Sequence, residues 1–175
     1  MNLKLKRTPG LYLAGFMASG KTTAGRVLAA ELGWRFADID SEIEQAEGMP
    51  ISQIFRERGE GAFRDLETTI IRRYVRQVQS GVPWVIALGG GALVQQANWQ
   101  VLENNGVTIW LDCPLDRIRK RLGSDTTRPL AADPEKLAQL FEERRPLYSR
   151  AHFRVEADCD DASEIVGRIL QLPLF

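Results

Sequence analysis

Short apolar runs alternate with longer segments of helical period along this chain. Five runs are expected to form strands: Leu11–Ala14, Arg35–Asp38, Val85–Leu88, Val107–Asp112 and Phe153–Glu156. Between the first two, residues 21–32 carry apolar side chains on one helical face and end at Gly33. Because strands that alternate with helices form parallel βαβ units, the pattern predicts an α/β fold. We expect a three-layer sandwich around a central five-stranded parallel sheet, with the ligand site at the carboxyl ends of the strands.

Two segments interrupt this alternation. Residues 41–80 read as a long helical stretch broken at Gly48–Pro50 and Gly59–Gly61, which is too long for a simple crossover, so a substrate-binding subdomain is expected there. Residues 123–133 form a polar loop rich in Gly, Thr, Pro and Asp, which is typical of a mobile lid. Pro114 and Pro134 suit first-turn positions of two later helices, and Asp133 is the expected N-cap of the second.

Composition narrows the class of protein without identifying it. The 175 residues, 44% hydrophobic and 26% charged, predict a single domain spanning residues 1–175. A net charge of zero argues against nucleic-acid binding. No apolar run resembles a signal peptide or is long enough to span a membrane, so we expect a cytoplasmic protein without membrane contact. The spacing of Cys113 and Cys159 predicts neither a disulfide nor a zinc site, and a lone His152 excludes a multi-histidine centre.

The segment Gly15–Thr22 has the pattern G-x-x-x-x-G-K-[ST] between a predicted strand and a predicted helix. Backbone N–H groups of such a loop converge on phosphate oxygens, and the helix N-terminus adds positive potential. Lys21 would bridge the β- and γ-phosphates, and the Thr22 hydroxyl would coordinate Mg²⁺. A chance glycine-rich turn is the alternative. The motif indicates a nucleoside triphosphate, but GTPases, motor ATPases and metabolite kinases share it.

Asp38 and Asp40 end the second apolar run. If the strand continues through both residues, their carboxylates point the same way, and one can hold water on Mg²⁺ while the other orients an attacking hydroxyl. Alternatively, Asp40 or Ser41 only caps the next helix. Asp112, at the end of another run, is a competing metal ligand, but because Pro114 follows it we expect a turn or cap residue there.

Three consecutive glycines, Gly89, Gly90 and Gly91, follow the third apolar run. Glycines at a strand end let a ligand approach the backbone closely and expose amide donors. A flexible turn without a ligand is an equally good interpretation of these glycines taken alone.

Six segments in order along nearly the whole chain resemble the motif series of shikimate kinases. They are Gly15–Thr22, Phe36–Ile43, Phe63-Arg64 followed by Glu67, Ala87–Gly91, Thr127–Leu130 and Arg144–Tyr148. The resemblance implies a P-loop fold like that of the nucleoside-monophosphate kinases. It also implies an alcohol phosphotransferase that uses ATP with Mg²⁺ to convert shikimate to shikimate 3-phosphate, in the chorismate pathway of aromatic amino-acid synthesis. A monomer is the default expectation.

The resemblance also assigns site residues. It makes Lys21, Asp40 and Arg128 catalytic, with Arg128 in the lid. The acceptor would be bound by Asp40, Arg64, Gly89, Gly90, Gly91 and Arg144; the nucleotide by Ala18, Ser19, Gly20, Lys21, Thr22, Thr23 and Arg121; and the metal by Thr22 and Asp38. Arg64 and Arg144 would hold the carboxylate, which guanidinium groups bind in a bidentate fork. Arg145 competes with Arg144 for this role, and only the Arg-x-Pro-Leu-Tyr pattern separates them. Arg121 would stack on adenine.

Two departures from the family pattern are visible. Ala18 stands where the family usually has glycine, which is unfavourable if that position needs a positive φ. The segment Glu156–Ala162 lacks the expected proline of an adenine-contacting loop, so no adenine contact is expected there. The apolar tail Leu170–Phe175 suits packing either on the core or on a partner.

Two other functions fit some of the same residues. A related metabolite kinase acting on a hydroxy acid such as gluconate would use the same fold and would also bind a carboxylate. A regulatory nucleotide-binding module without transfer chemistry is a second alternative, although the catalytic positions named above are all present.

Overall fold

The computed structural model describes residues 10–123 and 132–174, and it has the alternating elements that the sequence predicts. In chain order these are β1 (Gly10–Ala14), α1 (Lys21–Leu32), β2 (Arg35–Asp38), α2 (Ile39–Glu47), α3 (Ile51–Gln79), β3 (Trp84–Ala87), the short 3₁₀ turn η1 (Ala92–Val94), α4 (Gln96–Glu103), β4 (Val107–Asp112), α5 (Leu115–Leu122), α6 (Pro134–Tyr148), β5 (Phe153–Glu156) and α7 (Ala162–Leu170). Most of the predicted lid, including Arg128, lies in residues 124–131, outside the described ranges.

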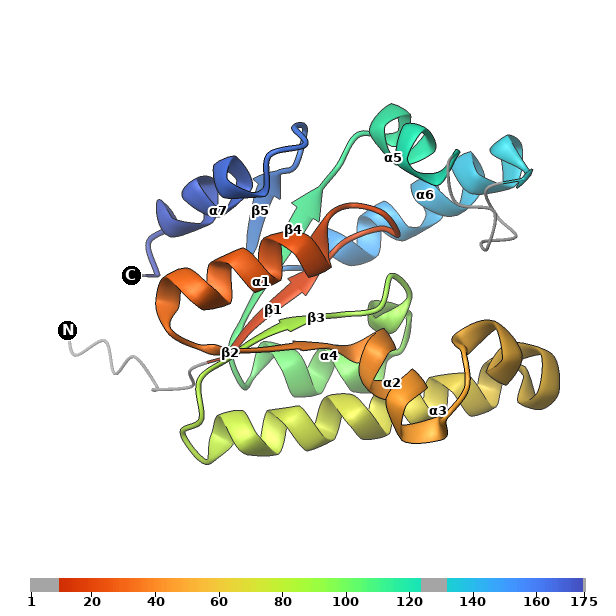
Figure 1. The fold of residues 1–175 in the computed structure, drawn as a ribbon, viewed down its shortest axis with the longest axis horizontal. Coiled ribbons are helices and arrows are strands. Elements are labelled where there is room, and N and C mark those ends of the chain that lie inside the picture. Colours follow the sequence, from red (N-terminus) through yellow and green to blue (C-terminus); the bar gives the residue numbers. More distant parts are fainter. Residues whose placement is uncertain (1–9, 124–131, 175) are drawn as a thin grey trace.

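The strands form one parallel sheet in the order β2-β3-β1-β4-β5. Helices α1 and α7 contact each other and cover one face of the sheet, whereas α3 and α4 lie together on the other (Figure 1). The three-layer fold and the five-stranded parallel sheet predicted from the sequence are confirmed. Since β1 is central and its two neighbours, β3 and β4, come later in the chain, the loop after β1 opens into the crevice where ligands bind in such sheets.

The central strands of the sheet are buried on both faces, in agreement with their continuous apolar sequences. All five residues of β1 are buried, and so are all four of β3, which is typical of a parallel sheet covered on both faces. Helix α1 comes close to β2 because it carries Gly25, where a β-carbon would lie 2.6 Å from the Phe36 ring. The lack of a side chain at Gly25 therefore allows α1 to pack closely on the sheet.

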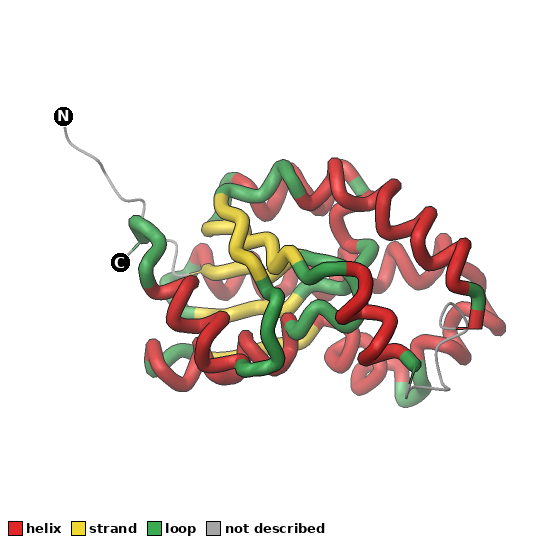
Figure 2. The backbone as a smooth tube through the Cα atoms, turned by 90° about the horizontal axis from the view of Figure 1, so that it is seen from above, coloured by secondary structure: helices red, strands yellow, loops and turns green. Residues whose placement is uncertain are grey.

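The segment proposed as a subdomain consists of α2 and α3, which extend past the carboxyl ends of the strands (Figures 1 and 2). Gly59 interrupts α3 with a φ of 81° and a ψ of 173°, so the break expected near Gly59–Gly61 is present. Arg73 on α3 donates to Glu42 on α2 at 2.5 Å, and Arg58 donates to Glu47 at the same distance. These ion pairs join the two helices into one unit.

One of the two proline positions expected in the later helices differs from the prediction. Pro114 is the N-cap of α5 rather than a residue of its first turn. Pro134 does begin α6, and the Asp133 carboxylate accepts a hydrogen bond from the Lys136 amide at 3.1 Å, as an N-cap should. Across the described ranges, every helix is too short or too polar to cross a membrane.

Candidate functional site

The phosphate-binding motif forms a tight loop between β1 and α1. At Gly15, which has a φ of 146°, a β-carbon would lie 2.7 Å from the Leu111 carbonyl oxygen, so only glycine fits against β4 there. Gly20 is the N-cap of α1 in the left-handed conformation, and among the described residues no side chain caps this helix. The first amides of α1 are therefore left to bind an anion, which is the arrangement that phosphate groups prefer.

Lys21 is folded into this loop. Its buried ammonium group donates to the carbonyl oxygens of Gly15 at 2.9 Å and of Phe16 at 2.8 Å. Ser19 lies under the loop with no exposed surface. The charge of Lys21 is thus held against backbone carbonyl oxygens at the start of the loop, where it would complement the charge of a polyphosphate.

Ala18 has a φ of 57°, and it is the only residue other than glycine with a positive φ in the described part of the chain. The condition under which alanine is unfavourable at this position is therefore met. The Ala18 carbonyl oxygen accepts a hydrogen bond from Nη1 of Arg121 at 2.8 Å. A residue 103 positions away thus holds the strained loop residue in place.

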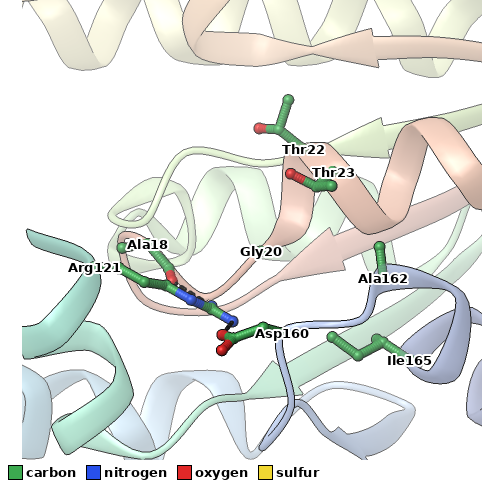
Figure 3. Close-up of a pocket in the computed structure, with 8 residues that line it drawn as sticks. All are labelled: Ala18, Gly20, Thr22, Thr23, Arg121, Asp160, Ala162 and Ile165. Atoms are coloured by element: carbon green, nitrogen blue, oxygen red, sulfur yellow. Dashed lines mark hydrogen bonds and ion pairs between the residues drawn. The ribbon is translucent and has the colours of Figure 1, made fainter.

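Arg121 reaches this loop across a cavity of about 330 Å³. The cavity is lined by Ala18, Gly20, Thr22, Thr23, Arg121, Asp160, Ala162 and Ile165 (Figure 3). Nη2 of Arg121 donates to the Cys159 carbonyl oxygen and to Asp160 Oδ1, both at 3.1 Å. The guanidinium group is therefore fixed between the P-loop and the segment that leads into α7.

The cavity adds residues that were missed from sequence. The sequence predicts no adenine contact in Glu156–Ala162, yet Asp160 and Ala162 line the same cavity as the P-loop. Asp161, between them, caps α7 by accepting from the Ser163 amide at 2.8 Å. The cap could have been predicted from the sequence, because an Asp stands before an apolar helical pattern. A helix that begins there follows the last strand, so the residues next to Asp161 could have been expected at the carboxyl edge of the sheet.

The aspartate pair is placed differently from the sequence expectation. Strand β2 ends at Asp38, and Ile39 already begins α2, so Asp40 lies in the first turn of a helix. It is Asp38 that caps this helix, with Oδ1 accepting from the Ser41 amide at 3.2 Å. Its Oδ2 accepts a short hydrogen bond from the Thr22 hydroxyl. The expected cap at Asp40 or Ser41 is therefore wrong, and the two carboxylates are separated by the change from strand to helix.

The Thr22 hydroxyl and the Asp38 carboxylate are the two protein oxygens that the sequence assigns to a metal. Their direct contact shows that both can face one ion, and hydroxyl and carboxylate oxygens are donors that Mg²⁺ accepts. No cluster of three or more His, Cys, Asp or Glu suited to a metal occurs within residues 10–123 and 132–174. Such a pair fits Mg²⁺ that takes its other ligands from phosphate oxygens and water, as in nucleotide sites.

Asp40 faces the glycine turn after β3. A β-carbon at Gly89 would lie 2.8 Å from Asp40 Oδ1 and 2.6 Å from Glu67 Oε2, so both carboxyl groups approach the same glycine. A β-carbon at Gly90 would lie 3.3 Å from the Met17 amide nitrogen and 3.6 Å from Arg144 Nη1. The absence of side chains at these two positions thus makes room for groups from four different segments.

Glu67 was also missed as a site residue, although it belongs to the segment Phe63-Arg64 followed by Glu67 that resembles the family. Its side chain is 0% exposed; Oε1 accepts from Arg64 Nη1 at 2.8 Å, and Oε2 has no partner among the described residues. Burial raises the pKa of the Glu67 carboxyl, and the charge of Asp40 raises it further, while Arg64 and Arg144 act in the opposite direction. A lone Glu on a long helix carries no signal of such burial.

Arg64 lies on the same wall of the site. Its guanidinium group contacts the backbone at Gly91, where a β-carbon would stand 2.4 Å from Nη2. The ion pair with Glu67 and a position over the Phe63 ring, 5.2 Å from its centroid, fix its direction. Arg64 is therefore held in place before any ligand arrives.

The two candidate arginines, Arg144 and Arg145, have different surroundings. Arg144 lies beside Gly90 and Tyr148, and Tyr148 donates to the Gly90 carbonyl oxygen at 2.5 Å. Burial raises the pKa of Tyr148 to about 12, so its hydroxyl remains a donor at neutral pH. Arg145 turns away and pairs with Asp112 at 3.1 Å. Only Arg144 faces the glycine turn.

Asp112 caps no helix in the described part of the chain and forms ion pairs with two arginines. It ends β4 with an 8% exposed carboxylate that binds the guanidinium groups of Arg145 and Arg154. Helix α5 begins after Pro114 without a side-chain cap from the described residues. The expectation of a turn or cap residue is therefore wrong, because the buried carboxylate is needed between two cations that the sequence pattern could not bring together.

Known proteins resemble this chain over most of its length. The family model for shikimate kinase matches residues 17–173. A shikimate kinase from Persephonella marina is 42% identical over 161 residues, covering 91% of this chain and 96% of that protein. A crystal structure of a shikimate kinase from Acinetobacter baumannii in complex with shikimate is 38% identical, with a TM-score of 0.87, over 95% of this chain and 93% of that one. A gluconokinase from Sinorhizobium meliloti, 17% identical with a TM-score of 0.57 over 94% and 91% of the two chains, shares the fold alone.

Proposed function

The chain belongs to the shikimate kinase family, and we propose that it transfers the γ-phosphoryl group of ATP to the 3-hydroxyl of shikimate, giving ADP and shikimate 3-phosphate. One observation carries the proposal beyond the family name. The glycine turn contacts the P-loop at Met17 on one side and Arg144 on the other. The phosphate donor and a carboxylated acceptor would therefore bind side by side, with Asp40 between them.

The acceptor would be held by its carboxylate. Arg64 and Arg144 approach the glycine turn from α3 and α6, and each guanidinium group can form a bidentate pair with a planar carboxylate. The backbone of Gly89, Gly90 and Gly91 would pack against the ring of the acid, because no side chain stands in the way. Shikimate has both features that this site accommodates: one carboxylate and hydroxyl groups across a small ring.

Phosphoryl transfer needs little proton chemistry and much positioning. The acceptor hydroxyl would donate a hydrogen bond to Asp40, and its oxygen would form a bond to the γ-phosphorus as the bond from that phosphorus to the β,γ-bridging oxygen breaks. The hydroxyl proton passes to Asp40, and ADP leaves with the bonding electron pair. Lys21 and the amides of the loop would stabilise the charge that develops on the phosphoryl oxygens, as Arg128 would from the predicted lid, residues 123–133, which would exclude water.

The nucleotide would lie across the P-loop with its base toward Arg121. Ala18, Ser19, Gly20, Lys21, Thr22 and Thr23 would surround the phosphates, and the cavity between Arg121 and Ala162 would receive the adenine. Thr22 and Asp38 would hold Mg²⁺, which when bound neutralises charge on the phosphate oxygens. Residues 41–80 would form the acceptor-binding subdomain.

We also propose that the protein acts as a monomer in the cytoplasm, without nucleic-acid or membrane partners. Gel filtration at micromolar concentration tests whether it is a monomer.

The test is a coupled ADP-release assay with MgATP and shikimate, run beside gluconate, no acceptor and the Asp40→Ala variant. We expect turnover with shikimate only, a product identified as shikimate 3-phosphate by ³¹P NMR, and loss of turnover in Asp40→Ala. Turnover with gluconate and not with shikimate would favour the other hydroxy-acid kinase, whose fold the chain shares. Tight ATP binding without turnover on any acid would favour a regulatory module.

A further inference from the structure

Helix α6 is held on two adjacent faces near its C-terminal end. Phe141 and Arg145 are four residues apart and lie on one face; Arg144 and Tyr148, also four apart, lie on the next. The first pair contacts Phe16 of the P-loop and Trp110 of β4, with the Phe141 and Phe16 ring centroids 5.4 Å apart. The second pair contacts the glycine turn. Rotation of the helix about its axis would therefore move both faces together.

Asp112 fixes the first face through Arg145. Nη1 of Arg145 lies 3.1 Å from Asp112 Oδ1, and Nη2 lies 3.5 Å from Oδ2. The guanidinium group also lies over the rings of Trp110 and Phe141, 5.3 and 5.4 Å from their centroids. Because the carboxylate is 8% exposed and Arg145 is 34% exposed, this pair is partly shielded from solvent and is less screened than a surface ion pair.

The ion pair between Arg145 and Asp112 lies next to a break in the hydrogen bonding of α6. Pro146 lies inside α6 and has no N–H to continue the helical hydrogen-bond ladder. Arg145, just before the proline, and Tyr148, two residues after it, both form contacts outside the helix, to Asp112 and to the Gly90 carbonyl oxygen. The direction of Arg144 at this point therefore depends on tertiary contacts more than on the helix alone.

We propose that Arg145, held by Asp112, is a positioning residue for the acceptor site: it fixes the rotation of α6 so that Arg144 faces Gly90 and the acceptor carboxylate. This inference rests on the proposed function, since it assigns Arg144 to that carboxylate. It concerns residues beside the proposed site, because the contacts of Arg145 are with Asp112, Trp110 and Phe141.

Arg154 supplies a matched control. It binds the same carboxylate, with Nε 2.8 Å and Nη2 2.7 Å from Asp112 Oδ2, and its guanidinium group also lies 5.3 Å from the Trp110 centroid. Its side chain is 56% exposed and comes from β5 rather than α6. Loss of Arg154 removes one partner of Asp112, as loss of Arg145 does, but leaves α6 attached.

The experiment compares Arg145→Gln with Arg154→Gln in steady-state kinetics and amide hydrogen exchange. We expect Arg145→Gln to raise KM for shikimate roughly fivefold or more while kcat and KM for ATP change by less than about twofold. Exchange should quicken in residues 141–148. Arg154→Gln should leave all three kinetic constants within about twofold and exchange in α6 unchanged. Equal effects of the two variants, or no effect of either, would overturn the proposal and leave the cluster a stability element.

Two further outcomes are separable. If the wild-type protein does not phosphorylate shikimate, the proposed function fails, and hydrogen exchange alone then decides the positioning claim: faster exchange in α6 for Arg145→Gln only supports it, and equal exchange overturns it. If Arg145→Gln does not fold, Arg145→Lys replaces it, because lysine keeps the charge but not the planar fork. A rise in KM for shikimate confined to that variant supports the claim, and an unchanged KM overturns it.

Discussion

The guanidinium group of Arg64 occupies the space that a side chain at Gly91 would fill. A β-carbon there would lie 2.4 Å from Nη2 and 2.7 Å from Nη1. Because Arg64 is also tied to Glu67, it cannot move aside without breaking a buried ion pair. We expect Gly91→Ala to raise KM for shikimate about tenfold or more, as the loss of one bidentate contact would, with little change in KM for ATP.

Gly167→Ala is the control for this change. Gly167 lies inside α7 with no atom within 4 Å of an added β-carbon, so this variant should be slightly more stable and fully active. Equal KM values for shikimate in Gly91→Ala and wild type would mean that Arg64 does not hold the acceptor.

Asp40 is expected to affect the rate of transfer rather than binding of the nucleotide. Asp40→Asn keeps the shape of the side chain but not its basicity, so kcat should fall by about 10²- to 10⁴-fold, the usual contribution of a positioned general base. Nucleotide affinity, measured by calorimetry with ADP, should be unchanged. A kcat close to the wild-type value in Asp40→Asn would remove this residue from the chemistry.

Asp38 is expected to affect the metal requirement. Its Oδ2 accepts from the Thr22 hydroxyl, and the Ser41 amide binds its other oxygen, so Asp38→Asn removes charge with little loss of structure. We expect the Mg²⁺ concentration for half-maximal activity to rise about tenfold. EDTA should abolish turnover in wild type and variant alike. An unchanged Mg²⁺ dependence in Asp38→Asn would exclude Asp38 as a residue that holds the metal or its water.

Ala18 is expected to lower the stability of the protein. An L-residue in the left-handed region costs roughly 1–2 kcal/mol, and glycine recovers this less its own cost of roughly 0.4–1 kcal/mol in the unfolded chain. Ala18→Gly should therefore increase the free energy of unfolding by about 0.5–1 kcal/mol. Urea denaturation measures it.

Ala30→Gly is the matched control for Ala18→Gly. Ala30 is exposed within α1, where the backbone is helical, and glycine there should cost about 1 kcal/mol. If both substitutions destabilise the protein, the P-loop residue does not carry the strain that its φ indicates.

The raised pKa of Glu67 predicts a pH dependence of stability. The folded protein binds this proton more tightly than the unfolded chain, whose carboxyl titrates near its ordinary value of 4.5. The stability gained from the protonated form is present below that value and is lost as the pH rises through the folded-state pKa. Glu67→Gln cannot ionise and does not lose this stability. Its free energy of unfolding should therefore rise relative to that of wild type as the pH increases from 4 to 7.

Glu60→Gln separates this effect from the simple loss of a charge near Arg64. Glu60 pairs with the same guanidinium group at 3.4 Å but is 68% exposed. Its stability curve should run parallel to that of wild type across this pH range. Parallel curves for Glu67→Gln as well would show that the pKa of Glu67 is the same in the folded protein as in the unfolded chain.

Local patterns predicted those parts of the fold and site that depend on residues close in sequence. The bounds of α1, β2, β4 and β5 follow from apolar period and stop residues, and the N-cap at Asp133 from its place before a proline. These features need only a few neighbouring residues to be specified.

Features that depend on partners distant in sequence could not be predicted in this way. Asp40 lies on a helix because the chain turns after Asp38, which a strand pattern does not show. Asp112 is buried between arginines 33 and 42 positions away, and this contact is what separates Arg145 from Arg144. Asp160 meets Arg121 only when α5 and the β5–α7 loop come together.

The contact between Arg64 and Glu67 limits how the acceptor site can evolve. Glu67 has no exposed surface, so its charge depends on Arg64, and Arg64 in turn is aimed by it. Replacement of Arg64 alone would leave Glu67 buried without its ion pair, and replacement of Glu67 alone would leave Arg64 with only the exposed Glu60 to direct it. A descendant that abandoned carboxylated substrates would therefore have to replace both residues, and the intermediate with only one replacement would be the least stable member of the lineage.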